Sequence, residues 1–150
     1  MCDSLQDAHL LFEKKPTINL FSWNAMLRGY MRNRMFQETL GLYYQMIREG
    51  VDPDSFTFPH VLKACTALSA LQEGRKIHDL IVEKGVESDN FVASIFIDMY
   101  SKHGVVEFAC QVFDKMSERD VVTCCAMISG LVHNGNYQET LKRFPQMQLT

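Results

Sequence analysis

The sequence has few of the features that mark membrane, secreted or metal-binding proteins. No apolar run approaches the roughly 18 residues that a transmembrane helix needs, so we expect no membrane association. The five cysteines form no Cys-x-x-Cys pair and show no zinc-ligand spacing, which favours buried, reduced thiols over a disulfide framework. The formal net charge of −3 excludes a broad basic surface. Any contact with nucleic acid would therefore depend on local residues.

Catalytic and cofactor motifs are also missing. The sequence has no Gly-rich phosphate loop, no Ser/His/Asp order and no deaminase pattern of HxE with PCxxC. Its five histidines lack an i, i+4 partner suited to zinc. We therefore predict no catalytic residue, no metal, no cofactor and no small-molecule substrate. The N-terminus has no basic, apolar leader, so we expect no targeting peptide in this chain.

The stretch from Leu20 to Asp54 has the pattern of two helices joined by a loop. Apolar residues recur in it at spacings of three and four, which is helical periodicity. They are Trp23, Met26, Leu27 and Tyr30 in the first half, and Leu40, Tyr43, Met46 and Ile47 in the second. Gly50 stands where a helix commonly ends, and Pro53 resists its continuation. We predict one helix-turn-helix unit with Trp23 in its core.

The same unit recurs along the chain. A small residue marks one place in each copy, at intervals of 31 to 35 residues: Ala8, Thr39, Gly74, Ala109 and Thr140. Such a period indicates a stacked helical array, in which a small side chain lets two helices approach. We therefore predict a single all-α solenoid. In the last copy, Arg143 replaces an apolar residue and Pro145 lies inside the expected second helix, so we expect that helix to kink or fray.

The repeats resemble those of pentatricopeptide repeat (PPR) proteins, specifically the plant subgroup that alternates P-type, L-type and S-type motifs. The resemblance rests on FSWNAMLRGYMRN with GVDPD, FTFPHVLKACTALSALQEGRKIHDLIVEKGVESD and FVASIFIDMYSKHGVVEFACQVFDKMSERD. It places a partial S-type motif at 1–19, a P-type at 20–54, an L-type at 55–89, an S-type at 90–120 and a truncated P-type at 121–150. It implies a right-handed α-solenoid that binds single-stranded RNA, one base per repeat.

The resemblance also implies which side chains contact the RNA. The fifth and last residues of each motif would read a base: Asn24 with Asp54, Pro59 with Asp89, Ser94 with Asp120, and Cys125 in the truncated copy. The second residue of each motif would stack between bases: Phe21, Phe56, Phe91 and Val122. The first pair resembles the uridine-preferring combination and the third the guanosine-preferring one. The expected target, 5′ to 3′, is therefore uridine, any base, guanosine.

The chemistry of these residue types agrees with such roles, although other interpretations remain open. An asparagine amide offers a donor and an acceptor to a base edge, whereas Pro59 offers neither and the thiol of Cys125 is a poor hydrogen-bonding group. Asn24 and Asp54 equally suit helix capping and loop hydrogen bonds. Arg32 and Lys102 share helix faces with the predicted readers and would contact phosphate; a solvated charged face is the alternative.

The resemblance further implies a mitochondrial or chloroplast location and a role in RNA editing or processing. The array would hold an organellar transcript for proteins of an editing complex, without performing catalysis itself. Two alternatives remain. One is a protein-binding scaffold of the tetratricopeptide kind, whose 34-residue Trp-Leu-Gly-Tyr pattern is missing here. The other is a truncated, non-functional copy, which Arg143, Pro145 and Cys125 would suit.

Overall fold

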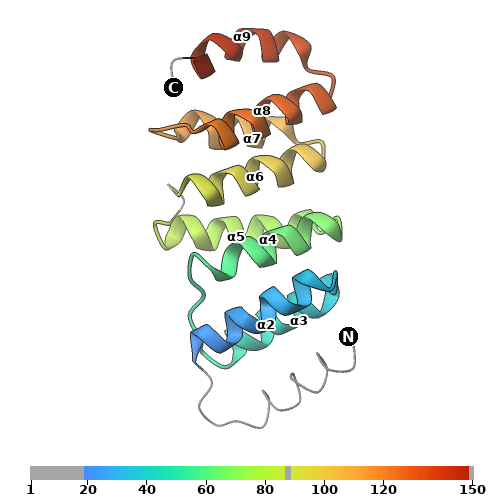
Figure 1. The fold of residues 1–150 in the computed structure, drawn as a ribbon, viewed down its shortest axis with the longest axis vertical. Helices are drawn as coiled ribbons and strands as arrows, with labels where there is room; N and C mark the ends of the chain where they lie inside the picture. Colours follow the sequence, from blue (N-terminus) through green and yellow to red (C-terminus); the bar gives the residue numbers. More distant parts are fainter. Residues whose placement is uncertain (1–18, 87–88, 149–150) are drawn as a thin grey trace. The chain divides into compact units, whose positions relative to one another are not determined.

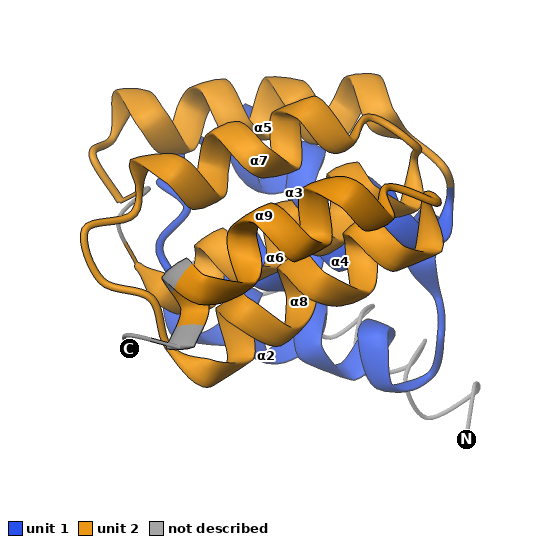
Figure 2. Cartoon of the chain, turned by 90° about the horizontal axis from the view of Figure 1, so that it is seen from above, with its two compact units in different colours: residues 1–68 blue, residues 69–150 orange. Residues whose placement is uncertain are grey.

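The computed structural model describes residues 19–86 and 89–148, and all regular structure in these ranges is α-helical (Figure 1). This confirms the predicted all-α class. The partial motif expected at 1–19, with Ala8, lies outside the described residues except for Asn19. The chain divides into two compact units, residues 1–68 and 69–150 (Figure 2), and each is described by itself. Within the described ranges, no helix is long and apolar enough to cross a membrane.

The first unit contains three described helices: α2 (Leu20–Arg32), α3 (Phe36–Arg48) and α4 (Thr57–Ala67). Helix α3 packs against both α2 and α4, and α2 also contacts α4. The largest fully buried side chains are Trp23, Leu27, Met46, Phe58 and Leu62. The prediction that Trp23 belongs to the core is confirmed. Because α4 packs on α2, the first helices of two successive predicted motifs lie against each other.

The second unit contains α5 (Leu71–Glu83), α6 (Asn90–Lys102), α7 (Val106–Lys115), α8 (Val121–His133) and α9 (Tyr137–Gln148). Helix α6 packs against α5, α7 and α8, and α8 packs against α7 and α9. This central position explains why α6 buries every residue from Val92 to Ile97. The division between the units falls between α4 and α5, inside the predicted motif 55–89. The motif boundaries themselves stay a prediction.

Acidic or amide side chains begin the first helix of each predicted motif. Asn19, Asp89 and Asp120 are the N-caps of α2, α6 and α8, and each accepts a backbone N–H of the helix that follows. In the motif 55–89, Thr57 is not the N-cap. Instead α4 begins at Thr57, and Asp54 Oδ1 accepts the N–H of Phe56 and of Thr57, both at 3.0 Å. The last residue of one motif therefore starts the next helix.

Left-handed residues shape the turns inside the predicted motifs. They are Arg34 (φ 57°), Ser69 (φ 55°), Gly104 (φ 76°) and Gly135 (φ 73°). Their spacing repeats that of the motifs, because the same turn joins the two helices of each copy. Glycine takes this conformation without steric cost, whereas Arg34 and Ser69 adopt it against their own preference.

Helices α6 and α8 approach closely where α8 carries a glycine. A Cβ atom at Gly130 would lie 2.1 Å from Ser101 Oγ and 2.7 Å from Ser101 Cβ, so no larger residue fits without movement. One turn further along, Asn134 Nδ2 donates to the backbone oxygens of Ser101 and Gly130, at 2.9 and 2.7 Å. The contact and the shared hydrogen bonds fix the two helices against each other.

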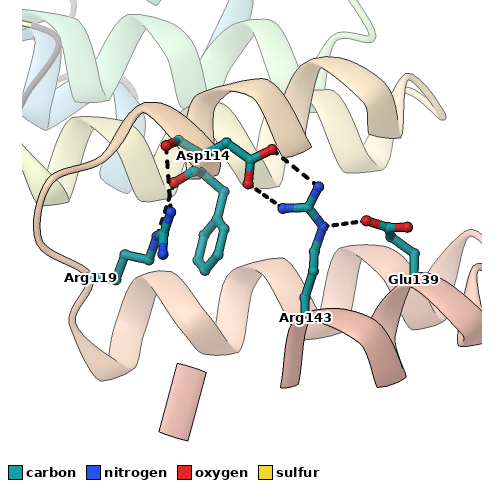
Figure 3. A network of polar contacts seen from close by, with 5 residues as sticks. Asp114, Arg119, Glu139 and Arg143 are labelled. Atoms are coloured by element: carbon teal, nitrogen blue, oxygen red, sulfur yellow. Dashed lines mark hydrogen bonds and ion pairs between the residues drawn. The ribbon is translucent and has the colours of Figure 1, made fainter. Parts of the chain in front are cut away.

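Arg143, which replaces an apolar residue in the last copy, forms ion pairs with two carboxylates. Its guanidinium bonds both carboxylate oxygens of Asp114 in α7, and its Nε donates to Glu139 Oε1 at 2.6 Å (Figure 3). Arg119 donates from Nε to the backbone oxygen of Phe113 at 3.1 Å, close to the end of α7. Helix α9 also continues through Pro145 to Gln148. The last copy thus keeps both helices, and an ion pair joins its second helix, α9, to α7 of the preceding copy.

Candidate functional site

The first predicted reader pair, Asn24 and Asp54, is in direct contact. Asn24 Nδ2 donates to Asp54 Oδ1 at 3.1 Å, which joins α2 to the segment before α4. The hydroxyl of Thr57, in the first turn of α4, lies 2.7 Å from Asn24 Oδ1 and 2.9 Å from Asp54 Oδ1. Asn24 and Asp54 are thus in contact, and Thr57 completes a three-residue cluster. A base-reading role for the pair stays a prediction.

Asp54 is held in its ionised form by this cluster. Burial would by itself raise the pKa of the carboxyl, but hydrogen bonds from Thr57, Asn24 and the N–H of Phe56 outweigh it and lower the pKa below its usual value. At neutral pH the carboxylate is consequently an acceptor only. It can therefore face only the amide nitrogen of Asn24, not its oxygen.

The cluster lies in a groove of about 480 Å³ on the first unit. Its lining includes Phe21 from α2 and Phe56 from the start of α4, together with Asn24, Asp54 and Arg28. The predicted stacking residues are all exposed in spite of their apolar side chains: Phe21 by 77%, Phe56 by 71%, Phe91 by 55% and Val122 by 63%. A flat ring that enters this groove would find two aromatic side chains and one polar cluster.

The sequence-based predictions assigned no RNA-binding role to Arg28 or His60, which line the groove. They also assigned none to Thr57, which is buried and contacts Asn24. The pKa of His60 is lowered by burial and by the nearby charges of Lys63 and Arg28, so its ring is neutral at pH 7. A signal for Thr57 was available, because it follows Asp54 by three residues just as Thr123 follows Asp120.

The third predicted pair, Ser94 and Asp120, is arranged differently. Ser94 is buried in α6 and donates its hydroxyl to the backbone oxygen of Phe91 at 2.7 Å. Asp120 is exposed and accepts from the hydroxyl and N–H of Thr123, at 2.6 and 2.8 Å, which lower its pKa. Within the described part of the chain, no hydrogen bond joins Ser94 to Asp120. A guanosine-reading role for this pair stays a prediction.

The second predicted pair, Pro59 and Asp89, is divided between the two units. Pro59 is buried in the first turn of α4, where its missing N–H is tolerated. Asp89 is exposed, and one oxygen accepts the N–H of Phe91 at 2.8 Å. Pro59 therefore offers neither exposure nor a polar group to a ligand.

A second groove, of about 370 Å³, lies between α6 and α8. Cys125, the predicted reader of the truncated motif, is exposed there, and Lys102 lines the same groove. Lys102 Nζ forms an ion pair with Asp98 at 3.0 Å, so its charge is partly engaged. Arg32, the other predicted phosphate contact, is exposed at the end of α2. Both basic residues are thus at surface positions, and their contact with phosphate stays a prediction.

No cluster of three or more metal-ligating side chains occurs among the residues that the structure describes. The polar groups of the first groove are donors and acceptors in hydrogen bonds to one another. The arrangement can therefore bind a planar, polar ligand by stacking and hydrogen bonding.

Comparison with family models gives two kinds of match along the chain. A model described as PPR repeat family matches residues 18–67. A model described as PPR repeat matches residues 91–121 and again residues 122–149. The last two ranges overlap the predicted motifs 90–120 and 121–150, whose bounds and types stay a prediction.

Curated relatives come from Arabidopsis thaliana. One, named a pentatricopeptide repeat-containing protein, is 41% identical over 143 residues, which are 94% of this chain and 21% of the relative. A mitochondrial one is 38% identical over 146 residues, 97% of this chain and 23% of the relative. A chloroplastic one is 36% identical over 148 residues, 97% of this chain and 28% of the relative. The chain thus spans roughly a fifth to three tenths of these relatives' length.

Solved structures with a similar fold include the pentatricopeptide repeat protein PPR10 from maize. Its crystal structure matches 95% of this chain with a TM-score of 0.83 and 25% identity, and the match covers 22% of that protein. PPR10 in complex with an 18-nt psaJ RNA element matches 97% of this chain with a TM-score of 0.81 and 24% identity, over 23% of that chain. These matches confirm the predicted fold class of a helical-repeat solenoid.

Proposed function

Because the chain belongs to the pentatricopeptide repeat family, we propose that it binds single-stranded RNA and reads one base per repeat. The observation that carries the proposal is the first groove, where Asn24, Asp54 and Thr57 form a polar cluster beside two exposed aromatic side chains, Phe21 and Phe56. Stacking between aromatic side chains contributes about 1–3 kcal/mol per base, and the cluster adds hydrogen bonds to the base edge. The solved complex of PPR10 with an RNA element supports the choice of ligand.

The proposed target, 5′ to 3′, is uridine, any base and guanosine. Asn24 with Asp54 reads the uridine, whereas the buried Pro59 does not discriminate. Ser94 with Asp120 accounts for the guanosine, and Cys125 leaves the last position unread. Phe21, Phe56, Phe91 and Val122 stack between successive bases.

Such an array positions a transcript and performs no chemistry on it. We assign it to the plant subgroup with alternating motif types and to the editing or processing of organellar RNA, with editing-complex proteins as further partners. Relatives named mitochondrial and chloroplastic support an organellar location.

The test is equilibrium binding to single-stranded RNAs that differ at one position only. We expect uridine at the position of Asn24 to bind more tightly than the other bases, and Asn24→Ala to abolish that preference with a loss of about 1–2 kcal/mol. Fluorescence anisotropy with labelled RNAs measures both effects.

Asn136→Ala is the matched control, because Asn136 is exposed between α8 and α9 and lies outside both grooves. It should leave the preference unchanged. Equal binding of all four RNAs by the unaltered chain would contradict the proposal.

A further inference from the structure

The hydroxyl of Thr57 has one hydrogen and two nearby acceptors. It lies 2.7 Å from Asn24 Oδ1 and 2.9 Å from Asp54 Oδ1. Asp54 Oδ1 already accepts from the N–H groups of Phe56 and Thr57 and from Asn24 Nδ2. The N–H of Asp54 in turn donates to Thr57 Oγ1 at 3.1 Å. The hydroxyl hydrogen therefore points to Asn24 Oδ1, because this oxygen is the nearer of the two and because Asp54 Oδ1 already accepts three other donors.

The Asn24 amide is therefore held at both ends. Asp54 accepts from its nitrogen, and Thr57 donates to its oxygen. A flipped amide would place two acceptor oxygens, Asn24 Oδ1 and Asp54 Oδ1, against each other, which is repulsive. Thr57 is fully buried, so its hydroxyl has a fixed place beneath the groove.

Because the Asn24 amide cannot flip, its free donor and its free acceptor have fixed positions relative to a ligand. One N–H and one oxygen lone pair stay available on Asn24. Uridine offers a donor at N3 and an acceptor at O4, whereas cytidine offers an acceptor at N3 and a donor at N4. The two pyrimidines have the same shape and opposite polarity, so an amide that turns freely would accept both.

We propose that Thr57 is a positioning residue for base recognition: by fixing the Asn24 amide, its hydroxyl makes the groove discriminate uridine from cytidine. This inference rests on the proposed function and adds a residue from the next motif to the reading of the base. Thr57 is the third residue of its motif, and the third residue of the next motif is Val92, which has no hydroxyl. The fifth residue of the motif before Val92 is Pro59, which has no side-chain amide that a hydroxyl could hold.

The RNA test compares uridine and cytidine at the position of Asn24. In the 150-residue chain, Thr57→Val should lower the uridine-over-cytidine affinity ratio roughly five- to tenfold, the effect of one lost hydrogen bond. Thr57→Ser keeps the hydroxyl and should keep the ratio. An unchanged ratio in Thr57→Val overturns the inference.

Thr123→Val provides a matched control. It removes a hydroxyl that bonds Asp120 at 2.6 Å at another junction, where no reader amide is bonded. The ratio at the Asn24 position should stay that of the unaltered chain. If Thr123→Val lowers the uridine-over-cytidine affinity ratio as much as Thr57→Val does, the effect comes from a general loss of stability, and the inference is overturned.

A measurement without RNA separates this inference from the proposed function. Nitrogen-15 relaxation of the Asn24 side-chain amide should report a rigid group in the unaltered chain and in Thr57→Ser, and a mobile group in Thr57→Val. Equal rigidity in all three overturns the positioning role, whatever the RNA result. Absence of any base preference in the unaltered chain overturns the proposed function instead.

Discussion

At the residue scale, Asp54 combines the two interpretations that the sequence left open. Its carboxylate accepts N–H groups at the start of α4, which is capping, and it also orients the amide of Asn24. The motif positions that the resemblance implies identified both residues. They did not identify Thr57 as a donor, because a threonine at a helix start is usually explained by capping alone. Only the geometry shows that its hydroxyl lies closer to Asn24 than to Asp54.

Ser69 allows a test of backbone strain at a single residue. It is exposed and has a φ of 55°, a left-handed conformation that costs a non-glycine residue about 1–2 kcal/mol. Glycine removes that cost but gains unfolded-state freedom, so Ser69→Gly should stabilise the protein by about 0.5–1 kcal/mol. The midpoint of urea unfolding at constant slope measures the change.

The reverse substitution serves as the control. Gly104 has the corresponding place in the turn between α6 and α7, with a φ of 76°. Gly104→Ser should lower the unfolding midpoint. If both variants shift the midpoint in the same direction, strain at this turn position does not explain the effect.

At the element scale, an ion pair between Asp114 and Arg143 joins α7 and α9. Comparison of the repeats shows that Arg143 stands where the other copies have an apolar residue. Arg143 is nevertheless paired, because Asp114 and Glu139 lie within reach of its guanidinium. A kink at Pro145 stays a prediction. Pairing across two helices depends on tertiary structure, which helical periodicity does not contain.

A double-mutant cycle measures the strength of this link. Arg143→Met keeps most of the apolar stem, and Asp114→Asn keeps the shape of the carboxylate. We expect a coupling free energy of about 0.5–1 kcal/mol, because the pair is bidentate while Asp114 is half-exposed and screened by solvent.

The pair of the exposed Lys76 and the half-buried Glu73, 3.7 Å apart on α5, is the comparison cycle and should give a coupling near zero. Chemical unfolding of the four variants of each cycle supplies the free energies. A coupling for Arg143 and Asp114 no larger than that of the comparison pair would contradict the structural role.

At the scale of the whole molecule, the sequence was most informative about repetition. A period of 31 to 35 residues predicted the helical pairs and the fold class, since each repeat is a local unit with its own apolar faces. The division between α4 and α5 was not predictable in the same way. It depends on which residues are in tertiary contact, and periodicity does not contain that information.

The small net charge predicts how RNA binding should respond to salt. With Arg32 and Lys102 as the candidate phosphate contacts, the logarithm of the binding constant should fall with the logarithm of salt concentration with a slope of about −1.4. Lys102→Ala should reduce the magnitude of the slope by about 0.7. Anisotropy titrations from low to physiological salt provide the values, and a slope twice as steep would indicate phosphate contacts elsewhere.

The capping role of Asp54 limits how such a protein can evolve new targets. Any replacement at this position changes the partner of Asn24 and the start of α4 together. Only Asp, Asn, Ser, Thr and, less well, Gly begin helices efficiently. Few residue types are therefore available at the last position of a motif. A protein that evolves a new RNA target must vary mainly at the other reading position, the fifth residue of the motif.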